Sequence, residues 1–321
     1  MSEVLLETKN LSRYFEVPRG TLHAVEKVNM QIHRGQTMGV VGESGCGKST
    51  LGRVVTRLLE PTSGEVYFEG QNITAVPRDK LHSIRKKMAF IFQDPYSSLN
   101  PRMSVQELIA EPLLINKALP SASEVYKRVH ELMEVVGLAE RLASAFPHEL
   151  DGGRRQRIGI ARALALNPEF IVCDEPVSAL DVSIQAQILN LLMDLQDEMG
   201  LAYMFVTHDL KVVRHISDDI TVMYMGVCVE RSPSKELFQR QAHPYTRALL
   251  NSILVPDLTR RRKIEIIKGE VTSPINPKPG CRFAPRCPYR TDICTERDQE
   301  LVEIWPNHFV ACEHPLDGGA T

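Results

Sequence analysis

The chain has 321 residues, 43% of them hydrophobic, and a formal net charge of −2. This length suffices for one large domain with a smaller one, and the near-neutral charge argues against a general nucleic-acid binder. The sequence contains no run of about 18–20 apolar residues to cross a bilayer, and residues 1–5 do not resemble a signal peptide. We therefore expect a cytosolic protein, and any role at a membrane would have to come through partner subunits.

Strand and helix patterns alternate along most of the chain. Apolar runs predict strands at residues 25–32, 37–41, 65–68, 88–92, 170–173 and 203–206. Helices are expected at about residues 48–59 and 184–199. Residues 104–165 have a helical pattern, because Val125, Val129, Leu132 and Val136 recur at helical spacing and Gly137 ends that helix. This order predicts an α/β fold, with a mostly parallel sheet and an inserted helical subdomain at about residues 94–165.

The composition changes after residue 254. Residues 256–315 are rich in proline and carry Cys281, Cys287, Cys294 and Cys312, which predicts a loop-rich extension over residues 255–321. Seven cysteines in a reducing compartment do not indicate a disulfide framework. Four thiolates can bind Zn²⁺ or a [4Fe–4S] cluster, and free or cross-linked thiols are a third alternative. A basic run at residues 260–263 is expected to be a solvated face or linker.

A glycine-rich loop at residues 42–49 fits the pattern G-x-x-x-x-G-K-[ST]. The backbone N–H groups of such a loop, and the start of the helix behind it, bind phosphate oxygens. Lys48 is expected to reach the β- and γ-phosphates, and the Ser49 hydroxyl to bind Mg²⁺. The alternative is a glycine-rich turn without a ligand. The nucleotide-binding residues predicted here are Gly42, Ser44, Gly45, Gly47, Lys48, Ser49 and Thr50.

Two carboxylates end the predicted strand at residues 170–173. Asp174 at a strand end can bind the Mg²⁺ ion, and Glu175 can polarise an attacking water. A strand followed by Asp-Glu is a weak signal alone, but together with the phosphate loop it predicts nucleotide hydrolysis.

With these motifs in order, residues 1–254 resemble the nucleotide-binding subunits of ABC transporters. The resemblance implies a P-loop fold of the ABC type, with an antiparallel β subdomain, and roles for further residues. Gln93 would contact Mg²⁺ and relay motion to membrane subunits, and Asp181 would lie in a loop that crosses a dimer interface. His208 would contact the γ-phosphate, and Phe15 or Tyr14 would stack on adenine.

Narrower features resemble the ATPases of dipeptide, oligopeptide and nickel importers. They are residues 93–101, residues 242–247 and the cysteine-bearing extension. This resemblance implies ATP and Mg²⁺ as ligands, a [4Fe–4S] cluster on the four cysteines, and a place at the cytoplasmic face of the membrane. The implied partners are a sister ATPase, two permeases and an extracytoplasmic binding protein. Nickel or oligosaccharide import, a soluble ABC ATPase of DNA repair or translation, and a P-loop kinase or GTPase are the alternatives.

One motif departs from the family pattern. Where the family has Leu-Ser-Gly-Gly-Gln, this chain has Leu-Asp-Gly-Gly-Arg at residues 150–154. Asp151, followed by Gly152 and Gly153, would bring a negative charge towards the γ-phosphate of the ATP bound by the opposite subunit. At about 5 Å and an effective dielectric constant of about 20, this repulsion would weaken ATP binding by roughly 3 kcal/mol. One interpretation is a heterodimer with asymmetric sites. The other is that Asp151 is a helix N-cap. Arg154, where the family has glutamine, would supply a cation that offsets part of the repulsion.

Overall fold

A computed structural model describes residues 3–77, 79–252 and 273–317 of the chain. It divides the chain into two compact units. Unit 1 comprises Met1–Leu5, Ile32–Gln36 and Ala75–Phe205, and unit 2 comprises Leu6–Gln31, Thr37–Thr74 and Val206–Thr321. The predicted boundary at residues 254 and 255 and the basic run at residues 260–263 lie outside the described residues.

The strands of unit 1 are those predicted from continuous apolar runs. They follow the order β8-β7-β6, namely β8 (Ala202–Val206), β7 (Phe170–Asp174) and β6 (Met88–Ile91). β6 and β7 are parallel, in a register that pairs Met88 with Phe170 and Ile91 with Cys173. Every residue of β7 and β8 is buried, as expected for strands covered on both faces.

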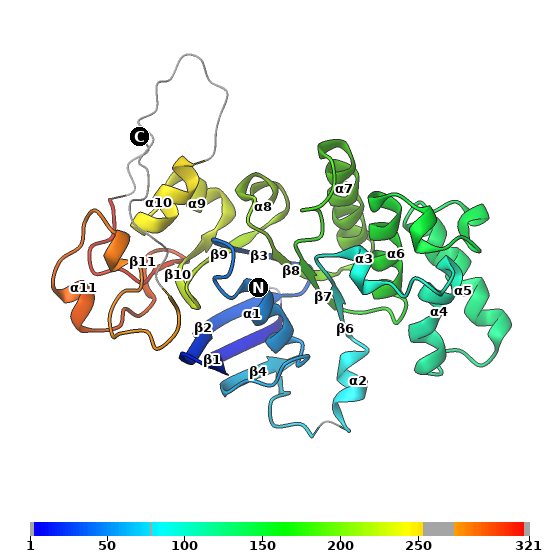
Figure 1. The fold of residues 1–321 in the computed structure, drawn as a ribbon, viewed down its shortest axis with the longest axis horizontal. Helices are drawn as coiled ribbons and strands as arrows, with labels where there is room; N and C mark the ends of the chain where they lie inside the picture. Colours follow the sequence, from blue (N-terminus) through cyan, green and yellow to red (C-terminus); the bar gives the residue numbers. More distant parts are fainter. Residues whose placement is uncertain (1–2, 78, 253–272, 318–321) are drawn as a thin grey trace, which may run out of the picture. The chain divides into compact units, whose positions relative to one another are not determined.

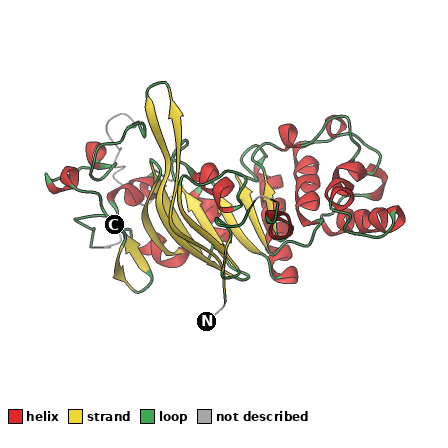
Figure 2. Cartoon of the chain, turned by 90° about the horizontal axis from the view of Figure 1, so that it is seen from below, coloured by secondary structure: helices red, strands yellow, loops and turns green. Residues whose placement is uncertain are grey.

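Unit 1 also contains a group of helices in the range where the sequence predicts a helical insertion. Its helices form a cluster of their own (Figure 1), and Figure 2 shows this cluster as a region without strands. The helices and 3₁₀ turns of the unit are α2 (Leu81–Arg85), α3 (Pro95–Ser98), α4 (Val105–Ile115), α5 (Ala122–Val135), η1 (Glu140–Leu142), η2 (Pro147–Glu149), α6 (Gly152–Leu164) and α7 (Val182–Met199).

Local sequence explains where these helices begin and end. Ser104 starts α4 with a capping box, in which Glu107 accepts from the Ser104 N–H at 2.7 Å. Ser121 caps α5, whose apolar stripe is buried as the periodicity predicts. Gly137 follows that helix with φ of +68°, a conformation that glycine adopts without strain.

Unit 2 contains the antiparallel β subdomain that the resemblance implies. Its strands follow the order β2-β1-β4-β5, and β4 pairs antiparallel with both β1 and β5. The bounds are β1 (Val4–Val17), β2 (Gly20–His33), β4 (Ser63–Phe68) and β5 (Gln71–Asn72).

A second group of strands in unit 2 follows the order β3-β9-β10-β12-β11. β3 (Thr37–Val41) is wholly buried and lies parallel to β9 (Asp219–Tyr224). The remaining pairs are antiparallel, and their strands are β10 (Val227–Pro233), β11 (Val302–Trp305) and β12 (His308–Val310).

The helices of unit 2 are short. α1 ends at Val55, four residues before the predicted end, and Arg57 then takes a positive φ of 55° that a continuing helix excludes. The set is α1 (Lys48–Val55), α8 (Leu210–Ile216), α9 (Ser234–Gln239), α10 (Pro244–Asn251), η3 (Ala284–Arg286) and α11 (Ile293–Glu296). Among the described residues, no helix combines the length and apolar character needed to span a membrane.

The described part of the extension, residues 273–317, is joined to the rest of unit 2 by a buried hydrogen bond that the sequence analysis did not predict. β12 pairs with β10 and brings His308 Nε2 to 2.7 Å from Glu230 Oε1, with both side chains fully buried. The N–H groups of Ala242 and His243 donate to the same carboxylate at 2.7 and 3.0 Å. A buried carboxylate needs such donors, so Glu230 links three segments of the chain.

Candidate nucleotide site

The glycine-rich loop lies between β3 and α1, as the motif requires. Gly47 is the N-cap of α1 with φ of +103°, and a Cβ atom there would lie 1.9 Å from the carbonyl oxygen of Ala24. At Gly42, φ is +152° and a Cβ would lie 2.2 Å from the carbonyl oxygen of Met223. Both positions therefore need glycine, because a side chain meets backbone atoms that cannot rotate away.

Lys48 is held inside this loop. Its side chain is 5% exposed, and Nζ donates to the carbonyl oxygens of Gly42 at 2.8 Å and Glu43 at 3.0 Å. The ammonium group thus lies within the ring of backbone groups that would surround a phosphate. Ser44 and Gly45 are exposed on the loop, and Ser49 and Thr50 belong to the first turn of α1.

The two candidate aromatic rings have different surroundings. Tyr14 stacks on His23, with ring centroids 4.1 Å apart, and its hydroxyl donates to Glu26 Oε1 at 3.3 Å. The ring of Phe15 is covered by the guanidinium of Arg13, whose Cζ is 4.4 Å from the centroid. Since successive residues of a strand point to opposite faces, the two rings do not share a face of β1.

In unit 1, the predicted magnesium and water residues meet at the end of β7. Asp174 is 1% exposed and is the last residue of the strand. Glu175 follows it with φ of +46°, an uncommon conformation for a side chain other than glycine. The amide Nε2 of Gln93 donates to Glu175 Oε2 at 3.0 Å. The structure therefore places the glutamine expected to contact Mg²⁺ beside the glutamate expected to polarise water.

The departing motif also lies in unit 1, at the start of α6. Asp151 is the N-cap, its Oδ1 accepts from the N–H of Arg154 at 2.8 Å, and its Oδ2 lies 3.5 Å from Arg154 Nη1. A Cβ atom on Gly153 would lie 2.7 Å from Cγ2 of Ile184, and one on Gly152 would lie 3.0 Å from Leu180. These glycines therefore pack against the start of α7, where Asp181 is the N-cap.

His208 belongs to unit 2 and follows β8. It is exposed, and the flanking residues fix its backbone, since the Thr207 N–H donates to Val40 at 3.1 Å and Asp209 caps α8. The N–H of Asp209 also donates to the Thr207 hydroxyl at 3.0 Å.

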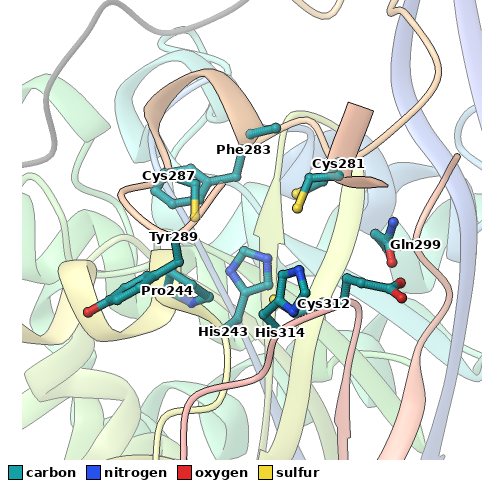
Figure 3. Close-up of a pocket in the computed structure, with 12 residues that line it drawn as sticks. His243, Pro244, Cys281, Phe283, Cys287, Tyr289, Gln299, Cys312 and His314 are labelled. Atoms are coloured by element: carbon teal, nitrogen blue, oxygen red, sulfur yellow. The ribbon is translucent and has the colours of Figure 1, made fainter. Parts of the chain in front are cut away.

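The four cysteines of the extension line one small cavity. Figure 3 shows the side chains of Cys281 and Cys287 pointing towards the ring of His243, and Cys294 and Cys312 complete the thiol lining. The cavity has a volume of about 20 Å³, room for about one water molecule. All seven cysteines of the chain are free, and burial raises the pKa of Cys312 to about 12.

These observations contradict the prediction of a [4Fe–4S] cluster. Within the described residues, no group of three or more His, Cys, Asp or Glu side chains is arranged to hold a metal ion. The prediction used only the residue type and the spacing of the cysteines, whereas metal binding needs thiolates at fixed distances around one point.

Two contacts to the phosphate loop were not predicted from the sequence. The N–H of Glu43 donates to Tyr245 Oη at 2.9 Å, and Arg286 Nη1 lies 2.9 Å from Glu43 Oε2. Arg286 also donates to Tyr224 Oη at 3.3 Å. Tyr245 lies in the stretch of residues 242–247 that the resemblance singled out, but Arg286 carried no sequence signal.

Comparisons with known proteins agree with this geometry. A family model described as ABC transporter matches residues 25–178, and one described as the C-terminal region of oligopeptide/dipeptide transporters matches residues 229–294. The oligopeptide transport ATP-binding protein OppF of Bacillus subtilis is 49% identical over 316 residues, covering 97% of both chains. The dipeptide transport ATP-binding protein DppF of Haemophilus influenzae is 47% identical over 318 residues, covering 97% of this chain and 96% of the relative.

This chain belongs to the ATP-binding subunits of ABC transporters. A solved dimeric ATP-binding cassette in a post-hydrolysis state, bound to ADP and phosphate, shares 33% identity and a TM-score of 0.66, covering 72% of this chain and 99% of that one. The ABC ATPase is therefore an enzyme that hydrolyses ATP, and its relatives bear the names of ordinary ATP-binding proteins.

Proposed function

We propose that this ABC ATPase powers the import of di- or oligopeptides from the cytoplasmic face of a membrane. The observation that carries the proposal is the match of residues 229–294 to the C-terminal region of oligopeptide/dipeptide transporters, beyond the ATPase core. The names of relatives that align along nearly the whole chain support the same class of substrate.

The residue roles follow from the chemistry of each group. The loop at residues 42–49 binds the ATP phosphates, with Lys48 as the cation and Ser49 as a ligand of Mg²⁺. Asp174 and Gln93 contribute to the Mg²⁺ site, Glu175 polarises the attacking water, and His208 stabilises the γ-phosphate. Tyr14 or Phe15 stacks on adenine. The contact of Gln93 with Glu175 at 3.0 Å supports a link between magnesium binding and the water-polarising carboxylate.

A groove in unit 1 supports docking of a permease. It has a volume of about 420 Å³ and combines apolar and cationic groups, including Phe90, Phe92, Pro112, Ile115 and Arg162. Phe92 and Ile115 are 37% and 69% exposed, unusual for large apolar side chains. Phe92 precedes Gln93, so a permease helix bound here would touch the segment that carries the magnesium-binding glutamine.

The departure at Asp151 supports a heterodimer. In this assembly a sister ATPase with a serine at that position faces the loop of this chain, and Asp151 faces the loop of the sister. Two permeases and an extracytoplasmic binding protein complete the transporter.

Affinity capture of the tagged full chain from gently solubilised membranes, read by mass spectrometry, tests this function. We expect two permeases, a second ATPase and a peptide-binding protein, and ATP turnover that rises with peptide-loaded binding protein. Ile115→Glu should remove the permeases from the captured set, whereas Val302→Glu, at an exposed apolar residue of β11, should not. Soluble partners alone would contradict the proposal, and a sugar- or nickel-binding protein would contradict the substrate class.

A further inference from the structure

Two arginines, one just before η3 and one at its last position, connect the extension to the nucleotide-binding part of unit 2. Arg282 and Arg286 each contact a carboxylate that lies in or beside the predicted ATP-binding residues. All four residues belong to unit 2. The two ion pairs therefore provide direct contacts between the C-terminal segment and the residues expected to hold the nucleotide.

Arg286 fixes the first variable residue of the phosphate loop. Its Nη1 lies 2.9 Å from Glu43 Oε2 and 3.3 Å from Oε1, and Nη2 lies 3.3 Å from Oε1. The Arg286 side chain is 7% exposed and that of Glu43 is 25% exposed, so water screens this pair less than a surface pair. Tyr245 holds the backbone of the same residue, accepting from the Glu43 N–H at 2.9 Å.

Arg282 contacts the group of residues around the predicted adenine-stacking ring of Tyr14. Its guanidinium pairs with Glu26 and also donates to the carbonyl oxygen of Met225. The Glu26 carboxylate accepts from Tyr14 Oη at 3.3 Å and lies 2.8 Å from His23 Nδ1, and these two rings are stacked. The next residue, Gly226, donates to the carbonyl oxygen of Cys46 in the phosphate loop at 2.9 Å.

The charges of Glu43 and Arg286 should affect how tightly the phosphate loop binds ATP. Glu43 carries a negative charge on a loop that would bind a polyanion, and repulsion between like charges weakens such binding. Arg286 neutralises that charge and limits the conformations of a loop with three glycines in six residues, which reduces the ordering cost of binding. Removing Arg286 alone would leave the carboxylate without its cation, the costlier of the two ways to break a pair.

We propose that the C-terminal extension is part of the nucleotide site, with Arg286 as the positioning residue of the phosphate loop and Arg282 as the positioning residue of the Tyr14–His23 stack. The inference rests on the proposed function, in which residues 42–49 bind ATP. It assigns to the extension a role in setting ATP affinity rather than the rate of phosphate cleavage, because neither arginine belongs to the residues assigned to hydrolysis.

The test compares KM for ATP and kcat of the assembled transporter. Arg286→Met should raise KM about tenfold and change kcat less than twofold, the pattern of lost uniform binding. The double variant Arg286→Met/Glu43→Gln should return KM to within about threefold of the wild type, because the unpaired charge is gone. The KM of Arg286→Lys should lie between those of the wild type and Arg286→Met. Arg290→Met, at an exposed residue of the same segment, is the matched control. Its KM and kcat should equal those of the wild type.

A second readout does not depend on assembly. Mg-ATP should raise the thermal unfolding temperature of the purified full chain, and Arg286→Met should reduce that rise, since ligand stabilisation depends on the ratio of concentration to Kd. Equal KM and equal thermal shifts for Arg286→Met and the wild type would overturn the inference, as would a double variant no better than the single one.

Lys48→Ala separates this inference from the proposed function. If Lys48→Ala loses ATP binding while Arg286→Met keeps the wild-type KM, the positioning role is wrong and the ATP site stands. If the wild type neither binds nor hydrolyses ATP, the proposed function fails, and the assignment of a positioning role fails with it.

Discussion

The side-chain amide of Gln93 and the carboxylate of Glu175 form a hydrogen bond of 3.0 Å within unit 1. The two residues are 82 positions apart in the sequence, and one follows β6 while the other follows β7. Because these strands are parallel neighbours, their carboxyl ends meet at one edge. A residue that can sense a magnesium ion thus touches the residue that can direct water.

Replacing Glu175 should separate ATP binding from ATP hydrolysis. Glu175→Gln keeps the size of the side chain but removes the base, so we expect turnover to fall by about 10²–10⁴-fold with ATP affinity retained. Steady-state phosphate release and nucleotide binding by the assembled complex measure the two effects. Glu198→Gln, at an exposed residue near the end of α7, is the control. A fall of less than threefold for Glu175→Gln would remove its assigned role.

The glycines of the phosphate loop should differ in their tolerance of alanine. Gly45 has φ of +77° and open space around a would-be Cβ, whereas the Cβ at Gly47 would meet a carbonyl oxygen at 1.9 Å. Gly45→Ala should therefore cost about 1–2 kcal/mol of local strain, and Gly47→Ala should cost more and abolish ATP binding. Equal ATP affinities for the two variants, measured by calorimetry, would contradict this steric argument.

Substitutions of Asp151 should distinguish its capping role from its electrostatic role. Serine caps a helix about as well as aspartate, so Asp151→Ser should preserve stability, while Asp151→Ala should cost about 1 kcal/mol. If the carboxylate weakens one ATP site of a heterodimer, Asp151→Ser should raise the turnover of the assembled complex. Turnover that stays constant in Asp151→Ser would leave the asymmetry without support.

The buried pair of Glu230 and His308 should contribute to stability rather than to turnover. His308→Leu leaves the Glu230 carboxylate, which is fully buried, without one of its donors, so we expect a loss of about 3 kcal/mol in the free energy of unfolding. Urea denaturation of the full chain measures this loss. His82→Leu, at an exposed histidine of α2, should change stability little, and similar midpoints for both variants would contradict the prediction.

Glu26 should make the protein acid-sensitive. Burial by itself would raise the pKa of Glu26, but hydrogen bonds and charge from His23 and Arg282 outweigh burial and hold the pKa below its ordinary value. A carboxylate with a depressed folded-state pKa stabilises the fold fully above its unfolded pKa, near 4.3. That stabilisation is lost as pH falls through the lower folded value.

The measurement is the urea midpoint between pH 5 and pH 3. We expect Glu26→Gln to be less stable than the wild type at pH 5 and to lose less stability on acidification. Glu296→Gln, at an exposed carboxylate of the extension, should follow the wild-type curve. Parallel acid curves for Glu26→Gln and the wild type would contradict the role of this carboxylate.

The buried strands, the helical character of residues 104–165 and the phosphate loop could all be predicted from residue patterns alone. Strands such as β3 and β7 are continuous apolar runs because they are buried on both faces. In the phosphate loop, the positive φ at Gly47 needs glycine, so the residue type itself marks the turn. These are local signals, and they need no knowledge of distant residues. The match to a known family likewise depends on short motifs in a fixed order.

The surroundings of these motifs could not be predicted, because they form only when the chain folds. The pairing of β12 with β10, the burial of Glu230 against His308, and the contact of Arg286 with Glu43 join residues 78 to 243 positions apart. No periodicity or spacing encodes such pairs, because they depend on which surfaces meet when the chain folds. The prediction of a [4Fe–4S] cluster on the four cysteines was wrong for the same reason. Their spacing is a property of the sequence, whereas a metal site depends on distances in space.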